Sequence, residues 1–479
     1  MITQNKNLFA LLFIVSLLLQ ACVTFKEIPV SEQNGIDSLL TTDFFKSSQA
    51  AISIFDLTEN KSVYRHNEKL LMRPASNQKI LTTGAAYHFL GDNFNFKTSV
   101  YHIGEIKDSI CNGNIYIVGG FDPDFNSADL DSLVRAIKHY GIKGITGNIY
   151  ADVSAMDSLF WGKGWMWDDD PESFAAYLTP LTINKNSVHI VAKPNSIGKP
   201  AIVELDPDTK FFTVENSSAT VDTGKTTLKI TRDWINRKNN IIISGNIFKS
   251  AKHDTVLLNV FNPTFYFLNL LRESFGRNGI SFNGEIDTLK MNKDAVNIFS
   301  FERSIVPVIT NTNKISDNLS AELLLRALSF NHSGKNASAK NGIALVDSLI
   351  TLTGLNPKNY TIVDGSGLSF YNLLSAELLT EVLKYFYYKE PKNFEKLFIS
   401  FPISGYDWTL KNRMKEGPTY KHVFAKTGSL SGVSNLSGYL KSRNNHLIAF
   451  SILIQNYTGS SNQARIIQDN ICKVIFENN

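Results

Sequence analysis

The chain is poor in the residues that build metal sites, disulfide frameworks and nucleic-acid surfaces. It has only three cysteines among 479 residues, and its nine histidines form no His-x-His or His-x-x-x-His pair. No metal or other cofactor is therefore implied. The formal net charge is only +4, without a dense basic run, so we expect no nucleic-acid partner. Internal repeats and low-complexity tracts are also missing, and the hydrophobic content of 43% is typical of a globular chain rather than a disordered one.

The sequence also lacks an apolar run long enough to cross a bilayer comfortably. Its N-terminal run, residues 8–19, is about 12 residues long and follows Lys6, as in a signal-peptide core. The next residues, Leu-Gln-Ala-Cys at 19–22, resemble a bacterial lipobox, whose cysteine becomes the lipidated first residue. We expect residues 1–21 to be a lipoprotein signal peptide and Cys22 to attach a periplasmic protein to a membrane. The alternative is an ordinary cleaved signal peptide; both interpretations predict export.

The two remaining cysteines, Cys111 and Cys472, are too far apart in sequence to indicate a disulfide framework. Export would permit a disulfide between them. We expect two buried, inert thiols, with pairing as the alternative.

The length predicts two or three domains, because a single core does not grow to this size. The start shows a hairpin and a helix, and the end shows helices, two strands and a last helix. The middle is rich in short strands and in Gly, Asn and Asp turns. This pattern predicts an α/β (α+β) fold in which helices cluster on an antiparallel sheet. We expect one discontinuous domain from residues 22–92 and 300–479, with a β-rich region, 93–299, inserted as two nested subdomains.

Several elements are specific enough to be predicted by their residue ranges. The strands are expected at 51–57, 62–65, 433–440 and 446–456, and the helices at 76–90, 130–140, 265–278, 318–328, 341–353, 376–388 and 461–476.

Three short strings carry the chemistry of this sequence. They are Ser-Asn-Gln-Lys at 76–79, Ser-Asp-Asn at 316–318 and Lys-Thr-Gly at 426–428. Each string alone is weak evidence: Ser-x-x-Lys also occurs at 196–199, and Ser-x-Asn begins at Ser281, Ser442 and Ser460. In this order and context, however, they indicate a serine enzyme that forms an acyl-enzyme and reacts with penicillin.

The residue types suggest a role for each member of the three strings. Ser76, at the start of a helix, is the expected nucleophile, and Lys79 is its expected base if burial and a neighbouring cation lower its pKa. Lys426 is the natural neighbouring cation and could also bind a substrate carboxylate. Ser316 could relay a proton to the departing amine, and Asn318 could hold the substrate amide. The backbone N–H groups of Ser76 and Ser429 are the expected oxyanion donors, beside Thr427 and Gly428 in the binding strand.

The chain resembles class C low-molecular-mass penicillin-binding proteins, the D-Ala-D-Ala carboxypeptidase/endopeptidase family. The resemblance extends beyond the three strings to segments at 113–123, 164–182, 364–369 and 437–440, and to the long gap between Ser76 and Ser316. It implies a penicillin-binding/serine β-lactamase-like transpeptidase domain with inserted domains. It also implies cleavage of peptidoglycan peptides ending in D-Ala-D-Ala, often cleavage of cross-links, and covalent inhibition by β-lactams.

One position departs from that family. After Asp-Gly-Ser-Gly-Leu-Ser the family often has an arginine that helps to hold the charged end of diaminopimelate, and here Phe370 stands instead. Asp169 corresponds to an acidic family position that would meet the amino group of that residue. We therefore expect intact acyl chemistry with altered side-chain recognition, in the direction of an amidated or less anionic group. Plain packing is the alternative role of Phe370.

Two other functions remain open from the sequence. One is a β-lactamase or esterase on the same scaffold, which the long insertion and the lack of an obvious deacylating glutamate disfavour. The other is a catalytically idle wall-binding or drug-sensing lipoprotein, which the five intact residues of the three strings disfavour.

Overall fold

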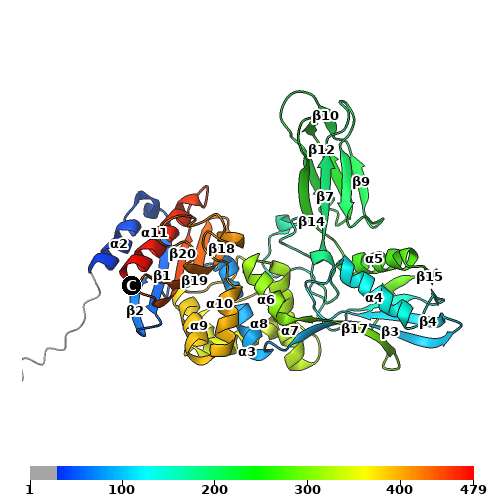
Figure 1. The fold of residues 1–479 in the computed structure, drawn as a ribbon, viewed down its shortest axis with the longest axis horizontal. Helices are drawn as coiled ribbons and strands as arrows, with labels where there is room; N and C mark the ends of the chain where they lie inside the picture. Colours follow the sequence, from blue (N-terminus) through cyan, green and yellow to red (C-terminus); the bar gives the residue numbers. More distant parts are fainter. Residues whose placement is uncertain (1–29) are drawn as a thin grey trace, which may run out of the picture.

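The structure is a computed structural model that describes residues 30–479. The beginning and the end of the chain form one α/β body, and residues from β3 to β17 form a second, β-rich body with a protruding lobe (Figure 1). The predicted signal peptide and Cys22 lie outside the described residues.

A five-stranded antiparallel sheet organises the first body. The two strands of the N-terminal hairpin pair with the C-terminal strands in the order β18-β19-β20-β1-β2. Strands β19 and β20 are buried along nearly their whole length, because helices cover both faces of the sheet. The strands are β1 (Gln49–Asp56), β2 (Lys61–His66), β18 (Val423–Leu430), β19 (Val433–Lys441) and β20 (Leu447–Gln455).

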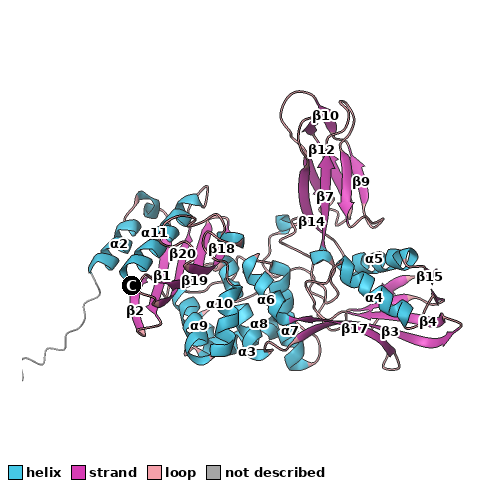
Figure 2. Cartoon of the chain, in the orientation of Figure 1, coloured by secondary structure: helices cyan, strands magenta, loops and turns pink. Residues whose placement is uncertain are grey.

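One face of this sheet is covered by the helices nearest the two ends of the chain, α2 (Val30–Leu40) and α11 (Asn462–Asn478). The other face packs against a cluster of helices around α3, which is buried from Gln78 to Tyr87 (Figure 2). Burial of an apolar face on each side gives this body two hydrophobic cores. The cluster consists of α3 (Gln78–Phe89), α6 (Ile305–Lys314), α7 (Asn318–Ser333), α8 (Ala339–Leu352), α9 (Ala376–Lys389) and α10 (Pro391–Ser400).

The inserted body is built on a seven-stranded mixed sheet with its own core. Helices α4 (Ser127–His139) and α5 (Pro263–Arg277) pack on it, and a capping box of Asn126 and Asp129 begins α4. The strands are β3 (Asn95–Lys107), β4 (Ile110–Val118), β5 (Gly144–Ile145), β6 (Ile149–Asp152), β15 (Ser281–Phe282), β16 (Ile286–Thr288) and β17 (Val296–Ser304).

The lobe that protrudes from this body contains only short strands in three small sheets. They are β7 (Ser187–Lys193), β8 (Ile202–Asp206), β9 (Thr213–Asn216), β10 (Ala219–Val221), β11 (Lys229–Arg232), β12 (Asn240–Ser244), β13 (Asn246–Phe248) and β14 (Asp254–Asn259). Single 3-10 turns occur at η1 (Asp43–Lys46), η2 (Ala75–Asn77), η3 (Trp167–Asp169), η4 (Asn184–Asn186), η5 (Pro357–Asn359) and η6 (Trp408–Leu410).

The predicted α/β class, with helices on an antiparallel sheet, is confirmed. Cys111 and Cys472 are both free and buried, as expected from their spacing, and burial raises the pKa of each thiol. Within residues 30–479, no helix is both long and apolar enough to cross a membrane.

Candidate active site

Ser76 lies in the 3-10 turn η2, directly before helix α3. The sequence prediction of a serine at a helix start is therefore correct, with the refinement that the first turn is tighter than an α-helix. The preceding residue, Ala75, has a φ of +46°, a left-handed conformation that costs energy in a residue with a side chain. The turn directs Ser76 toward a pocket that it lines.

Lys79 stands one helical turn after Ser76 and is completely buried. Its Nζ donates to Oγ of Ser76 at 2.9 Å, to Oδ1 of Asn318 at 2.6 Å and to the carbonyl oxygen of Ser366 at 2.8 Å. The structure thus brings the first and second strings into direct contact. Burial lowers the pKa of Lys79 to about 8, against the opposing effect of nearby carboxylates, of which Asp364 is the strongest. At pH 7 an amine with this pKa is neutral in about one molecule in ten, against fewer than about one in a thousand for an ordinary lysine.

Lys426, on strand β18, links the third string to the second. Its Nζ donates to Oγ of Ser316 at 2.8 Å and to the carbonyl oxygen of Thr427 at 2.9 Å. Burial and, second, repulsion from Lys79 lower the pKa of Lys426 well below its ordinary value. We expected the charge of Lys426 to lower the pKa of Lys79. In the structure burial is the main cause of the lowered pKa of Lys79, and the repulsion between the two amines lowers the pKa of Lys426 instead.

The Ser-Asp-Asn string is fixed from the inserted body. The side-chain amide of Asn318 donates to the carbonyl oxygen of Phe174 at 2.9 Å. The carboxylate of Asp317 pairs with Lys185, whose Nζ also pairs with Asp124. Lys185 and Ser320 lower the pKa of Asp317 below its ordinary value, although burial opposes them. The inserted body therefore holds the Ser-Asp-Asn string of the other body in place.

The Asp-Gly-Ser-Gly loop at 364–367 also supports Lys79, a role that was not predicted for it. Asp364 accepts hydrogen bonds from the backbone N–H groups of Gly367 and Ser369, at 2.9 and 2.7 Å. Glu322, on α7, accepts from the N–H groups of Gly365 and Ser366, both at 2.9 Å. These bonds orient the Ser366 carbonyl group, which accepts a hydrogen bond from Nζ of Lys79. The signal in the sequence was the Asp-Gly-Ser-Gly string itself, which combines a turn with a carboxylate.

Two glycines allow neighbouring segments to approach the turn that carries Ser76. A Cβ on Gly428 would lie 2.8 Å from Oδ1 of Asn77 and 2.8 Å from the carbonyl oxygen of Pro74. A Cβ on Gly367 would lie 1.8 Å from the carbonyl oxygen of Ala75, and Gly367 has a φ of +82°. The glycine of the Lys-Thr-Gly string is therefore required by close packing of β18 on η2.

The reactive groups open into one pocket of about 350 Å³. It contains Ser76, Ser316 and Asn318 from the strings and Ser429 from the end of β18, and it also contains both residues expected to recognise the substrate side chain, Asp169 and Phe370. Thr427 is not in its wall. It lines an adjoining hollow of about 580 Å³, and Ser429 lines both spaces, so the two meet along β18.

Behind Phe370, outside the pocket wall, lies an arginine that was not predicted as a site residue. The guanidinium carbon of Arg73 lies 5.6 Å from the centroid of the Phe370 ring, a cation–π arrangement. Asp169 accepts a hydrogen bond from the N–H of Met166 at 2.9 Å, and burial raises the pKa of its carboxyl group. Thus Phe370 lines the pocket and packs against a cation behind it.

The described residues offer one potential metal cluster, Asp56, Glu59 and His446. None of its members lines the pocket of Ser76. The donors that surround Ser76 are amines, amides and hydroxyls, which suit acyl transfer by a nucleophile and an amine base.

Comparisons with known proteins agree with this arrangement. The D-Ala-D-Ala carboxypeptidase 3 (S13) family matches residues 32–475. D-alanyl-D-alanine carboxypeptidase DacB of Haemophilus influenzae is 28% identical over 441 residues, which cover 91% of this chain and 90% of the relative. D-alanyl-D-alanine carboxypeptidase of an Actinomadura species is 26% identical over 467 residues, 93% of this chain and 84% of the relative.

A solved structure shares the fold over nearly the whole molecule. The crystal structure of penicillin-binding protein 4 from Haemophilus influenzae matches with a TM-score of 0.82 at 26% identity, covering 92% of this chain and 99% of that chain. The expected penicillin-binding fold is therefore confirmed. Because the family match spans almost all the described residues, the protein belongs to the D-Ala-D-Ala carboxypeptidase 3 (S13) family, the class C low-molecular-mass penicillin-binding proteins.

Proposed function

We propose that this protein is a serine D-Ala-D-Ala carboxypeptidase that cleaves peptidoglycan stem peptides through an acyl-serine on Ser76. We also propose that it cleaves the corresponding cross-links as a D,D-endopeptidase and that penicillins acylate the same hydroxyl. The observation that carries the proposal is a pair of lysine–serine contacts whose two serines line one pocket. Lys79 reaches Ser76 at 2.9 Å, and Lys426 reaches Ser316 at 2.8 Å.

In the first half-reaction, Oγ of Ser76 attacks the carbonyl carbon of the penultimate D-Ala, and neutral Lys79 accepts the hydroxyl proton. The lowered pKa of Lys79 makes this transfer possible, since a protonated amine cannot act as a base. Asn318 fixes the orientation of Lys79, because its Oδ1 accepts a hydrogen bond from Nζ of Lys79. Its amide group is also the proposed contact for the substrate peptide bond.

The oxyanion of the tetrahedral intermediate accepts hydrogen bonds from the backbone N–H groups of Ser76 and Ser429. Ser76 precedes α3, whose N-terminal end favours negative charge, and Ser429 lies on β18, an edge strand of the sheet. Loss of one such donor typically costs about 3–4 kcal/mol of transition-state stabilisation. When the intermediate collapses, the C–N bond breaks, and the departing amine takes a proton from the Ser316 hydroxyl, which Lys426 replenishes.

Lys426 has a second proposed role, as the partner of the terminal carboxylate of the substrate. A carboxylate beside it would raise its pKa and keep it charged. A charged Lys426 would in turn repel a proton from Lys79, so that substrate binding favours the neutral base. Once Lys79 has lost the Ser76 proton to solvent and Lys426 has regained one, water attacks the acyl carbon and Lys79 accepts a proton from it. Lys79 then returns this proton to Oγ of Ser76 as the acyl–oxygen bond breaks, which releases the shortened peptide and restores the hydroxyl.

We propose a cell-envelope protein, exported to the periplasm and attached to a membrane through a lipid on Cys22. We propose that residues 22–92 and 300–479 form the peptidase domain and that residues 93–299 are inserted. The inserted residues contribute Lys185 and Phe174 to the support of the Ser-Asp-Asn string.

The decisive experiment is digestion of purified cell wall by the wild-type protein and by Ser76→Ala, followed by chromatography of the products. Wild type should release D-Ala from pentapeptides and reduce cross-linked dimers, while Ser76→Ala should do neither. Ser76→Ala should also lose labelling by fluorescent penicillin with almost no change in Tm. Surviving label would mean that another group is the nucleophile. Rapid turnover of penicillin by wild type would instead indicate a β-lactamase.

A further inference from the structure

Four of the five tryptophans in this chain line a single cleft, beside the pocket of Ser76 but not part of it. This cleft, here called the Trp cleft, has a volume of about 380 Å³. Its size lies in the range of small-ligand sites. Its main lining residues are Phe160, Trp161, Trp165, Trp167, Trp234 and Arg237.

The Trp cleft exposes aromatic surface that folding would normally bury. The side chain of Trp167 is 71% exposed, and neighbouring Ile235 is 74% exposed. Trp167 packs on Trp234 of the protruding lobe, with ring centroids 5.1 Å apart and an angle of 36° between the rings. Contiguous exposed apolar surface of this kind marks a binding site more often than a structural feature.

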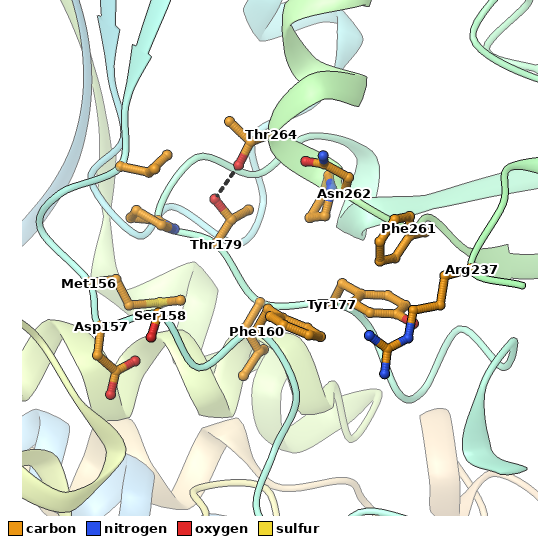
Figure 3. Close-up of a pocket in the computed structure, with 14 residues that line it drawn as sticks. Met156, Asp157, Ser158, Phe160, Tyr177, Thr179, Arg237, Phe261, Asn262 and Thr264 are labelled. Atoms are coloured by element: carbon orange, nitrogen blue, oxygen red, sulfur yellow. Dashed lines mark hydrogen bonds between the residues drawn. The ribbon is translucent and has the colours of Figure 1, made fainter. Parts of the chain in front are cut away.

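One wall of the Trp cleft also borders another hollow, which has a volume of about 370 Å³. Phe160, Tyr177 and Arg237 line both spaces, and Figure 3 shows them from the side of the second hollow. The rings of Phe160 and Tyr177 are stacked with centroids 5.9 Å apart, and the guanidinium of Arg237 lies over Phe160 at 5.8 Å. Phe160 is 43% exposed and Tyr177 only 4%, so the wall offers the Phe160 ring together with guanidinium N–H donors.

The Trp cleft is joined to the pocket of Ser76 through the turn η3. This turn begins with Trp167, which lines the cleft, and ends with Asp169, which lines the pocket. Trp165, also in the cleft, donates from Nε1 to Asp364 at 3.1 Å, in the loop that supports Lys79. A ligand held in the Trp cleft thus lies next to the peptide that occupies the pocket.

We propose that the Trp cleft binds a sugar ring of the glycan strand to which the stem peptide is attached. The C–H face of a pyranose is apolar and matches an aromatic ring face, while its hydroxyl and N-acetyl oxygens can accept from Arg237. The inference rests on the proposed function, because only a peptidoglycan substrate places a sugar near the reacting peptide. About four extended residues separate the scissile bond from the sugar, a reach of roughly 13 Å.

Charge disfavours a lipid surface as the occupant. The carboxylates of Asp168, Asp169 and Glu172 lie in or beside η3, and they would repel an anionic membrane. The second peptide of a cross-link could also contact aromatic rings, so the experiment includes a substrate with two peptides and no sugar.

The test compares cleavage of three substrates: the free pentapeptide, the same pentapeptide on N-acetylglucosaminyl-N-acetylmuramic acid, and a sugar-free cross-linked peptide dimer. Wild type should show a higher kcat/KM on the disaccharide pentapeptide than on the free one. Trp167→Ala and Trp234→Ala should lower that value by about 3- to 10-fold, the effect of losing one aromatic stacking contact. Their kcat/KM on the free pentapeptide and their acylation by penicillin should not change.

The matched control is Trp408→Ala, which removes a tryptophan that is 57% exposed and lies outside the Trp cleft. It should retain the wild-type preference for the disaccharide substrate. Equal kcat/KM of wild type on both pentapeptides would overturn the proposal, as would equal losses on both in the Trp variants. A loss confined to the cross-linked dimer would also overturn it, in favour of the second peptide.

A titration with the disaccharide alone, monitored by tryptophan fluorescence, tests sugar binding independently of peptide cleavage. If the enzyme cleaved none of the peptides, the proposed function would fail, yet the disaccharide should still quench wild type and not Trp167→Ala. No quenching of wild type at millimolar disaccharide would overturn the sugar assignment by itself.

Discussion

Nζ of Lys185, in the inserted body, forms an ion pair with the carboxylate of Asp317, the middle residue of the Ser-Asp-Asn string. The side chain of Asp317 is only 14% exposed, and its pKa is lowered by this partner. Two neighbours of Asp317, Ser316 and Asn318, contact the two active-site lysines. The ion pair therefore fixes the string on which both lysine contacts depend.

Replacement of this lysine, Lys185→Met, should slow acylation by penicillin at least about 10-fold and lower stability. Removal of one partner from a buried ion pair typically costs about 3–5 kcal/mol, and we expect about 2–3 kcal/mol because part of the lysine is exposed. Stopped-flow acylation and urea unfolding measure the two effects. In the double variant Lys185→Met/Asp317→Asn stability should partly recover, since no unpaired charge remains. Unchanged acylation in Lys185→Met would show that the pair does not position the string.

The rate of acylation should rise with pH through about 8, because Lys79 acts as the base only after losing its proton and its pKa is about 8. Below that pKa the rate should fall about tenfold for each pH unit. At the alkaline end the rate should fall again, because Lys426 must carry a proton to replenish Ser316 and its pKa is also lowered. Fluorescent-penicillin labelling at times short enough to give rates, from about pH 6 to about pH 10, measures this dependence. A rate that is flat or falls between about pH 6 and about pH 8 would contradict Lys79 as the base.

The substitution Gly428→Ala should impair both packing and catalysis. The added Cβ would sit 2.8 Å from Asn77 Oδ1 and from the Pro74 carbonyl oxygen, so β18 must move away from the turn of Ser76. We expect a loss of about 1–3 kcal/mol in the free energy of unfolding and slower acylation. The control is Gly276→Ala in helix α5, where a Cβ meets nothing within 4 Å. That variant should be as stable as wild type or slightly more so.

The substitution Phe370→Arg should change which stem peptides are preferred. An arginine there would place a guanidinium in the wall of the pocket, where it can pair with a free carboxylate on the substrate side chain. The ratio of kcat/KM for a carboxylate-bearing substrate to that for its amidated analogue should rise several-fold. Phe370→Leu, which keeps an apolar wall, should leave this ratio near that of wild type. Equal ratios in all three proteins would support a packing role for Phe370.

Much of the fold followed from local pattern. The hairpin, the helix of Lys79 and the last helix have clear apolar periodicity, and their predicted bounds agree with the structure to within a few residues. Helix α6 was not predicted, because its Thr- and Asn-rich end has low helix propensity and is stabilised by packing against α3, α7 and α10. Strand β18 was not delimited, since Lys-Thr-Gly-Ser interrupts the apolar pattern.

Candidates for the nucleophile, base and relay residue could be proposed from sequence because their order and types are specific, and the structure places them in contact. The residues that hold these candidates in place could not be predicted from sequence. Lys185 lies in an Asn-Lys-Asn turn with three left-handed residues, and nothing local connects it to Asp317, 132 positions away. Arg73 behind Phe370 is a similar case, because only the folded chain brings the two together.

The position of β1 between β2 and β20 also determines when the enzyme can become active. Strand β1 is made early, but its partner β20 ends only at Gln455, so the central pairing of the sheet must wait for nearly the whole chain. At ordinary synthesis rates this delay is on the order of a minute, and an unpaired apolar strand is prone to aggregation meanwhile. The inserted body has its own core and can fold first. A growing chain that stops before β18 has neither Lys426 nor a complete sheet, so truncated products remain inactive.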